Sequence, residues 1–356
     1  MASIEDVARA TGVSTATVSR ALRGLGSVAE PTRVRVQRAA QTLGYVPSAA
    51  AASLASGRTK AVGLVTPHVS RWFFSVAIET IEAVLRTHGY DVLLVILPPG
   101  DQVRPGPGAI VPPSRPTIET ELLRKRVDAT VVLTLPLVHR ELQTLRGLGH
   151  AVVNVGDVVP GLPSFGIDDV EVGRLATRHL LDLGHTDVHL VGGSGDEPGG
   201  WGPTRDRYVG YREVMEAAGL RARPAISCDL TVAEGRRAAR ELLARPALPT
   251  GLVATSDELA IGLLHELRLA GVAVPGDVSV VGVDDHPHAE LHDLTTIAQP
   301  VAEQAEAAAR WLLRLLGTAG PVAGRLPADW DRHVERLPTA LVVRGSTARA
   351  RVRQQR

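Results

Sequence analysis

Apolar residues at the start of the chain recur with the period of an α-helix. Ile4, Val7 and Ala8 are spaced i, i+3, i+4 and so share one face of a helix. Gly12 can end this helix, and Ser14 has the hydroxyl group of a good N-cap for a second one. We expect that second helix to reach about residue 22. Its inner face would hold Val18, Ala21 and Leu22.

A third helix is predicted after a short break that contains glycine. Pro31 suits the first turn of a helix, where its missing N–H is no loss, and Gly44 can end the helix. Val34, Ala39 and Leu43 form the expected apolar stripe. The first 45 residues therefore read as three short helices.

From residue 61 the pattern changes, because apolar runs rich in Val, Leu and Ile alternate with amphipathic segments. The expected strands are 61–66, 90–97, 129–135, 151–156, 187–192, 225–228, 251–255 and 278–283. The expected helices are 74–88, 117–126, 138–148, 170–183, 205–218, 231–244, 257–270 and 301–316. Repeated alternation of strand and helix indicates parallel sheets covered by helices on both faces. Units of this kind could form either one barrel or two open sheets.

Three long segments interrupt this alternation. Residues 157–168 and 284–300 resemble loops and could be crossings between two lobes. Residues 98–116 are rich in Pro and Gly, show no period and are too long for a simple turn. We interpret them as a surface insertion of unknown role.

Charge is unevenly distributed along the chain, although its formal net value is only +1. Residues 1–60 hold eight Lys or Arg against three Asp or Glu, and the rest holds 31 basic and 35 acidic residues. A basic module joined to a mildly acidic body is the asymmetry expected when one end contacts nucleic acid.

The cysteine content and the apolar runs of the sequence indicate the cellular compartment. Cys228 is the only cysteine, so no disulfide can form within the chain, which fits a reducing cytosol. The first residues lack the apolar stretch of a signal peptide, and no apolar run has the roughly 18 residues needed to span a bilayer. We therefore expect a cytoplasmic protein without a membrane partner.

Residues 4–22, IEDVARATGVSTATVSRAL, have the pattern of a helix-turn-helix. The outer face of the second helix carries short or hydrogen-bonding side chains suited to a DNA major groove, namely Thr15, Ala16, Thr17, Ser19 and Arg20. Arg20 can bind guanine O6 and N7 with two hydrogen bonds. The hydroxyls of Ser14, Thr17 and Ser19 are better placed to contact DNA phosphates than base edges. Periodicity alone is equally compatible with a three-helix bundle that has a solvated polar face.

The same stretch resembles the headpiece of the LacI/GalR family of bacterial transcriptional regulators. The resemblance continues through 28–67 and resumes in blocks that include DDVEVGRLATRHLLDLGHTDVHLVGG (168–193), RYVGYREVMEAAGL (207–220), GVAVPGDVSVVGVDD (271–285) and LTTIAQP (294–300). These blocks cover nearly the whole chain and occur in the family's order.

The resemblance implies a fold class and a domain plan. An all-α helix-turn-helix headpiece would precede an α/β core of two lobes with parallel sheets, similar to periplasmic sugar-binding proteins and joined by three crossovers. The predicted domains are the headpiece (1–46), a hinge helix and linker (47–60), the effector-binding and dimerisation core (61–345) and a disordered basic tail (346–356). The headpiece would act as a homodimer on double-stranded DNA with a near-palindromic operator.

Residues 47–57 resemble the family's hinge helix, and they are too few to hold a helix alone. Leu54 stands where family members insert a leucine between base pairs in the minor groove, which kinks the duplex. Ser48 and Ala52 depart from the common Asn and Arg, which could remove a polar or phosphate contact. Tyr45 completes the set of DNA-binding residues that the resemblance implies. An exposed apolar residue in a linker is the alternative interpretation of Leu54.

In the core, five positions match effector contacts of the family: Phe73, Phe74, Arg207, Asp257 and Asp284. A carboxylate that accepts hydrogen bonds from neighbouring hydroxyls and an aromatic face that stacks on apolar edges both suit a sugar. Phe73 could instead belong to the core, and Asp257 could be only a helix cap. Trp72 and Trp201 are further aromatic candidates for the cleft, and Asp157 and Asp168 lie near the proposed lobe crossing. Ser256 stands where the family frequently has Asn.

No catalytic or metal-binding constellation competes with this interpretation. The segment 192–200, GGSGDEPGG, lacks the GK[ST] ending of a phosphate loop, and the twelve histidines show no metal-ligand spacing. We expect no enzyme activity and no cofactor. The leading hypothesis is a transcriptional regulator, most often a repressor in this family, controlled by a sugar or sugar derivative. A sugar-binding transport protein would explain the core but not residues 1–60, and a sugar-modifying enzyme lacks catalytic residues.

Overall fold

The computed structural model describes residues 2–22, 24, 26–45, 58–97, 127–135, 141, 143, 151–193, 202–317 and 332–351. Four predicted features lie wholly or mostly outside these residues: the hinge helix with Leu54, the insertion 98–116, the helices 117–126 and 138–148, and Trp201. The chain divides into two compact units, Met1–Lys60 and Ala61–Arg356, and each is described by itself.

The first unit contains the three expected helices, α1 (Ile4–Thr11), α2 (Thr15–Leu22) and α3 (Glu30–Leu43). Helix α1 begins at a capping box, in which Ser3 and Asp6 each bond the other's main-chain N–H. It ends at Gly12, whose φ of 67° is the left-handed conformation that glycine adopts without strain. Val7, Val18 and Ala21 are fully buried between the helices, as the periodicity predicted for α1 and α2.

The predicted stripe of α3 is mostly wrong, because of its three residues only Ala39 packs, partly buried, against the core of this unit. Val36 and Ala40 are the buried residues of this helix, whereas Leu43 is 40% exposed. A helix turns by about 100° per residue, so the four-residue step from Val36 to Ala40 returns to nearly the same face. The five-residue step from Val34 to Ala39 ends on a different face, and the two residues cannot share one stripe. Arg33 fixes the rotation of α3, because its guanidinium donates to the carbonyls of Gly24 and Val28 at 3.1 and 3.2 Å.

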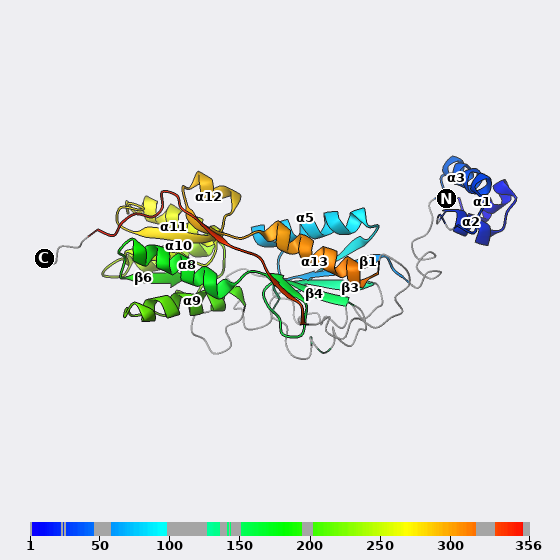
Figure 1. Cartoon of the computed structure of the whole chain (residues 1–356). Helices are drawn as coiled ribbons and strands as arrows, with labels where there is room; N and C mark the ends of the chain where they lie inside the picture. Colours follow the sequence, from blue (N-terminus) through cyan, green and yellow to red (C-terminus); the bar gives the residue numbers. More distant parts are fainter. Residues whose placement is uncertain are drawn as a thin grey trace. The chain divides into compact units, whose positions relative to one another are not determined.

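The second unit contains two separate sheets, which decides between the open alternatives in favour of two lobes. The larger sheet has six strands in the order β10-β5-β4-β3-β1-β2, and all neighbours in it are parallel. Its strands are β1 (Ala61–Thr66), β2 (Asp91–Ile96), β3 (Ala129–Leu133), β4 (Ala151–Gly156), β5 (Ser164–Gly166) and β10 (Val334–Arg336). Helices α5 (Trp72–Thr87) and α13 (Val301–Leu315) lie side by side over one face of this sheet (Figure 1).

The smaller sheet has five strands in the order β11-β9-β8-β7-β6, and only β11 runs antiparallel to its neighbour. Its strands are β6 (Val188–Val191), β7 (Gly251–Ala254), β8 (Ser279–Asp284), β9 (Thr295–Ala298) and β11 (Ala340–Val342). One face packs on α8 (Asp169–Asp182) and α9 (Pro203–Ala217), and the other packs on α10 (Val232–Leu243) and α11 (Asp257–Leu269). A short helix, α12 (Pro287–Leu291), follows β8.

The chain passes between the two sheets three times. It leaves the larger sheet after β5 and enters α8 through residues 167–168, and it returns through residues 299–300 between β9 and α13. Residues 337–339 make the third passage, between β10 and β11. The three crossovers implied by the family resemblance are therefore present. None of the helices in the described segments is long and apolar enough to cross a membrane.

The end of the described chain corrects one prediction. Residues 346–350 are not a disordered tail, because they add hydrogen bonds along the smaller lobe. Ser346 is 1% exposed and its hydroxyl donates to the carbonyl of Val280 at 2.6 Å. The main-chain N–H of Ala350 donates to the carbonyl of Leu183 at 2.8 Å. Main-chain and hydroxyl groups make these contacts, so the basic composition of the segment did not indicate them.

Candidate functional site

The outer face of α2 presents the residues predicted to meet DNA. Ser14, Thr15, Ala16 and Arg20 are exposed, and Thr17 and Ser19 are half-buried. Ser14 caps the helix, because its hydroxyl accepts the main-chain N–H of Thr17 at 3.2 Å. The hydroxyls of Ser14 and Thr17 also lie 3.0 Å apart. A cap and a short polar face at a helix N-terminus are what phosphate contact requires.

Tyr45 follows the end of α3 and packs partly against the core of the first unit. Its main-chain N–H donates to the carbonyl of Ala40 at 2.9 Å, which ties the residue to the last turn. The position of Tyr45 is therefore fixed by the headpiece, and its contact with DNA stays a prediction.

Arg207 is held in the smaller lobe by a buried ion pair. Its Nε donates to Oδ1 of Asp169 at 2.8 Å, and another of its nitrogens donates to the carbonyl of Thr255. Helices α8 and α9 approach closely enough for this contact because Gly173 has no side chain; a Cβ there would collide with the main chain of Arg207. Burial raises the pKa of Asp169 to about 6, although the charge of Arg207 lowers it.

Asp257 supports the loop after β8. It is completely buried, and its Oδ1 accepts the hydroxyl of Thr296 at 2.7 Å. Its Oδ2 accepts the main-chain N–H of His286 at 2.8 Å. Burial and the neighbouring Asp284 raise the pKa of Asp257 well above its usual value. Ser256 supplies the N-cap of α11, so the helix-cap role considered for Asp257 belongs to the residue before it.

Asp284 ends β8 in an unusual backbone conformation. Its φ is 127° and that of Asp285 is 56°, both in the region that side chains rarely adopt. Gln299 donates to Oδ1 of Asp284 at 2.5 Å, and Arg344 donates to Oδ1 of Asp285 at 2.7 Å. Burial raises the pKa of Asp284 to about 6, against the lowering effects of Arg207 and the bond from Gln299.

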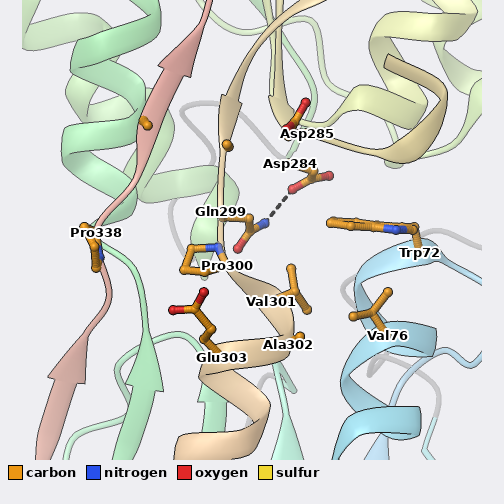
Figure 2. A pocket seen from close by; sticks show the side chains of 12 residues that line it. Trp72, Val76, Asp284, Asp285, Gln299, Pro300, Val301, Ala302, Glu303 and Pro338 are labelled. Atoms are coloured by element: carbon orange, nitrogen blue, oxygen red, sulfur yellow. Dashed lines mark hydrogen bonds between the residues drawn. The ribbon is translucent and has the colours of Figure 1, made fainter. Parts of the chain in front are cut away.

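A cavity of about 400 Å³ lies beside Asp284, within the range of small-molecule sites. Figure 2 shows the indole of Trp72 beside Asp284 in the lining, with Gln299 and Pro300 of the second crossover on another side. Among the described residues, its lining is Trp72, Val76, Asp284, Asp285, Ala298, Gln299, Pro300, Val301, Ala302, Glu303, Pro338 and Ala340.

The cavity therefore contains one of the five predicted effector residues, Asp284, and one of the further aromatic candidates, Trp72. The remaining four predicted residues do not line it. Phe74 is 8% exposed and belongs to the core of the larger lobe, where its ring meets those of Phe73 and His68 edge-on. Gln299 was missed as a site residue, although the segment LTTIAQP carries it to a crossover and so could have indicated it.

Two further carboxylates flank the first crossover. Asp168 caps α8 by accepting the main-chain N–H of Glu171 at 3.0 Å, which gives it a structural role. Asp157 is buried and accepts Nδ2 of Asn154 at 2.9 Å. Burial raises the pKa of Asp157 to about 7, and the charge of Asp169 contributes to this increase.

Taken together, a three-helix headpiece with a polar recognition face and a core of two crossover-linked α/β lobes define a DNA-binding regulator with a ligand-binding-type core. Residues 3–48 match the model of bacterial regulatory proteins of the lacI family, and residues 177–347 match the periplasmic binding protein-like domain. The chain belongs to the LacI family of transcriptional regulators.

Individual relatives agree with this assignment. The chain is 32% identical over 326 residues to the HTH-type transcriptional regulator RegA of Clostridium saccharobutylicum, covering 88% of this chain and 92% of the relative. It is 30% identical to the ribose operon repressor of Halalkalibacterium halodurans, covering 98% and 97% of the two chains. Among solved structures, the transcriptional regulator CelR in complex with cellobiose shares 28% identity with a TM-score of 0.66, covering 97% and 100%.

Proposed function

We propose that this regulator binds a near-palindromic operator as a homodimer and acts as a repressor. The observation that carries the proposal is the exposed face of α2, on which Ser14, Thr15 and Arg20 are free to reach a major groove while Val18 and Ala21 hold the helix in place. Two headpieces are needed because each recognition helix reads only one half-site. Leu54 would insert into the minor groove between the half-sites, as family resemblance implies.

The core is proposed to bind a sugar or sugar derivative between the lobes, near the cavity beside Asp284. Support comes from its lining, since an aromatic ring and a carboxylate both border a space of about 400 Å³. A carboxylate can accept hydrogen bonds from neighbouring hydroxyls, and an indole face can stack on the apolar side of a sugar ring. A similar solved structure, a transcriptional regulator in complex with cellobiose, and a relative named as a ribose operon repressor favour the same ligand class.

Effector and operator binding would be coupled through the two lobes. A ligand that prefers one arrangement of the lobes shifts the population toward it, and the hinge segment 47–57 would transmit the change to the headpiece. Phe73, Arg207 and Asp257 remain proposed members of the effector site. The chain would act in the cytoplasm, without a catalytic reaction or a cofactor.

A two-stage experiment tests this function. Thermal unfolding of the full chain is first measured against a panel of sugars, sugar phosphates and nucleobases, because a ligand at 100 times its dissociation constant stabilises by about 2.7 kcal/mol. Operator binding is then measured by fluorescence anisotropy with DNA selected from a random library. We expect one dominant two-fold symmetric motif. Selection of no motif would contradict operator recognition, and absence of any stabilising sugar would contradict the ligand class.

A further inference from the structure

The carboxylate of Asp284 begins a chain of hydrogen-bonded side chains that leads away from the cavity. Gln299 donates from Nε2 to Oδ1 of Asp284 at 2.5 Å (Figure 2). Gln304 donates from its Nε2 to Oε1 of Gln299 at 3.1 Å. The first residue ends β8 in the smaller lobe, the second lies in the second crossover, and the third lies in α13 on the larger lobe. The chain of contacts therefore runs from one lobe to the other.

The charge of Asp284 determines which groups donate and which accept in this series of hydrogen bonds. An ionised carboxylate can only accept hydrogen bonds, so it draws Nε2 of Gln299 toward itself and turns Oε1 toward Gln304. Gln304 must then present its own Nε2. Its side chain is completely buried, and its Oε1 has no hydrogen-bond partner among the groups that the structure describes. A buried amide with one end unsatisfied is unfavourable, which indicates that the interaction with Gln299 determines how Gln304 is oriented.

The backbone at Asp284 makes this arrangement sensitive to its side-chain contacts. Asp284 and Asp285 both have positive φ, a conformation that persists only where the surroundings hold it. Besides Gln299, the main-chain N–H of Asp257 bonds the Asp284 carboxylate. Arg344 bonds Asp285 at 2.7 Å, and the hydroxyl of Thr296 accepts the N–H of Asp285 at 3.4 Å. Of these, only Gln299 contacts the Asp284 carboxylate and also connects to the other lobe.

We propose that Gln299 and Gln304 are positioning residues of the effector site, and that they relay the state of the Asp284 carboxylate across the second crossover to α13. A ligand whose hydroxyls bond to Asp284 competes with Gln299 for the same oxygen. Because bonds to a charged acceptor are stronger than neutral ones and neighbouring bonds polarise one another, a change at Asp284 alters the bond between the two glutamines. The inference rests on the proposed effector role of Asp284.

The relay can be observed directly by NMR, because the chain has only eight glutamines. The full-length protein is labelled with ¹⁵N at glutamine, and the side-chain amide signals of residues 299 and 304 are assigned from Gln299→Met and Gln304→Met. Asp284→Asn replaces the charged acceptor by a neutral one. We expect the amide protons of both Gln299 and Gln304 to shift upfield in this variant, although Gln304 is not bonded to Asp284 itself.

The decisive comparison repeats Asp284→Asn in the Gln299→Met background, where the shift of Gln304 should disappear. Glu303→Ala is the matched control, since Glu303 is exposed, lines the same cavity and precedes Gln304, yet lies outside the relay. It should move the Gln304 signal less than Asp284→Asn does. A Gln304 signal that ignores Asp284→Asn, or shifts equally without Gln299, would overturn the relay.

A second measurement needs no substitution at Gln299, in case that variant does not fold. Lowering the pH through the pKa of Asp284, about 6, should shift the Gln304 amide more in the unmutated chain than in Asp284→Asn, where the neighbouring Asp257 is retained. The latter comparison separates Asp284 from the charged groups around it, Arg207, Asp257 and Glu258. An equal pH-dependent shift in both proteins would contradict the relay. These spectra require neither DNA nor ligand, so a negative result would leave operator binding and the effector response standing.

Discussion

Arg207 and Asp169 form an ion pair of 2.8 Å in which both side chains are almost completely removed from solvent, with 7% and 5% exposed. Removing two charges from water is unfavourable, and their mutual attraction repays only part of that penalty. The raised pKa of Asp169 shows that burial outweighs the attraction of Arg207 for this carboxylate. The pair therefore depends on both partners being present.

Removing the guanidinium should destabilise the core strongly. Arg207→Ala leaves Asp169 as an uncompensated buried carboxyl group, so we expect the free energy of unfolding to fall by about 3–5 kcal/mol in urea denaturation. Arg310→Ala is the matched control, because Arg310 forms an exposed ion pair with Glu306 and should change stability by about 0–1 kcal/mol. Equal losses in the two variants would show that the buried pair has no special role.

The buried carboxyl group of Asp157 predicts a pH dependence of stability. Its pKa in the folded chain, about 7, lies above the ordinary value of 3.8, so folding favours the protonated form. Its contribution is fully present below about pH 4 and is lost as the pH rises through 7. Asp157→Asn should therefore flatten the curve of unfolding free energy between pH 4 and 7. Asp91→Asn, at the exposed start of β2, is the matched control and should retain that slope. An unaltered slope in Asp157→Asn would contradict the assignment.

Arg20 is expected to read a base. Arg20→Ala should weaken operator binding and reduce discrimination at one base pair by about 1–3 kcal/mol, measured by selection of binding sites from a random library. Arg9→Ala removes an exposed arginine of α1 that is paired with Asp6 and should leave the selected motif intact. A motif that is the same for Arg20→Ala and the unmutated chain would remove Arg20 from the recognition set.

Leu54 is expected to kink the operator. Leu54→Ala should reduce both the affinity for DNA and the bend angle, because alanine is too small to separate base pairs. The bend can be followed by energy transfer between dyes at the two ends of a short operator duplex, with effector-induced thermal stabilisation as the control for an intact core. If the variant bends DNA as much as the unmutated chain does, the proposed insertion of Leu54 between base pairs is wrong.

Periodicity predicted the elements that bury a continuous apolar face. The strands β1, β4 and β8 and the helices α1, α8 and α13 lie close to their expected bounds, because such runs carry their own signal. The short elements were not predicted: β5 and β10 have three residues each, and α12 has five. Their formation depends on pairing with strands far away in sequence. The expected strand 225–228 makes only two isolated bridges, at Ile226 and Cys228.

Family resemblance pointed to named site positions, whereas contacts that cross between elements could not be predicted from the sequence. Asp284 lies on the cavity as expected, whereas Phe74 is used to fill the core and Asp257 has both oxygens bonded to protein groups. Gln299 acquires its role only because the second crossover places it against Asp284. No local pattern in the sequence encodes that distance.

The central claim is that a small molecule beside Asp284 controls the affinity of the headpiece for DNA. The most direct measurement is the operator dissociation constant with and without the sugar that most stabilises the full chain, for the unmutated protein and Asp284→Ala. We predict that the sugar changes the dissociation constant by at least about fivefold in the unmutated protein, the lower end of typical allosteric coupling. In Asp284→Ala, operator binding without sugar should be preserved and the change abolished. An equal response of both proteins to the sugar, or no response of the unmutated protein at saturation, would contradict the account.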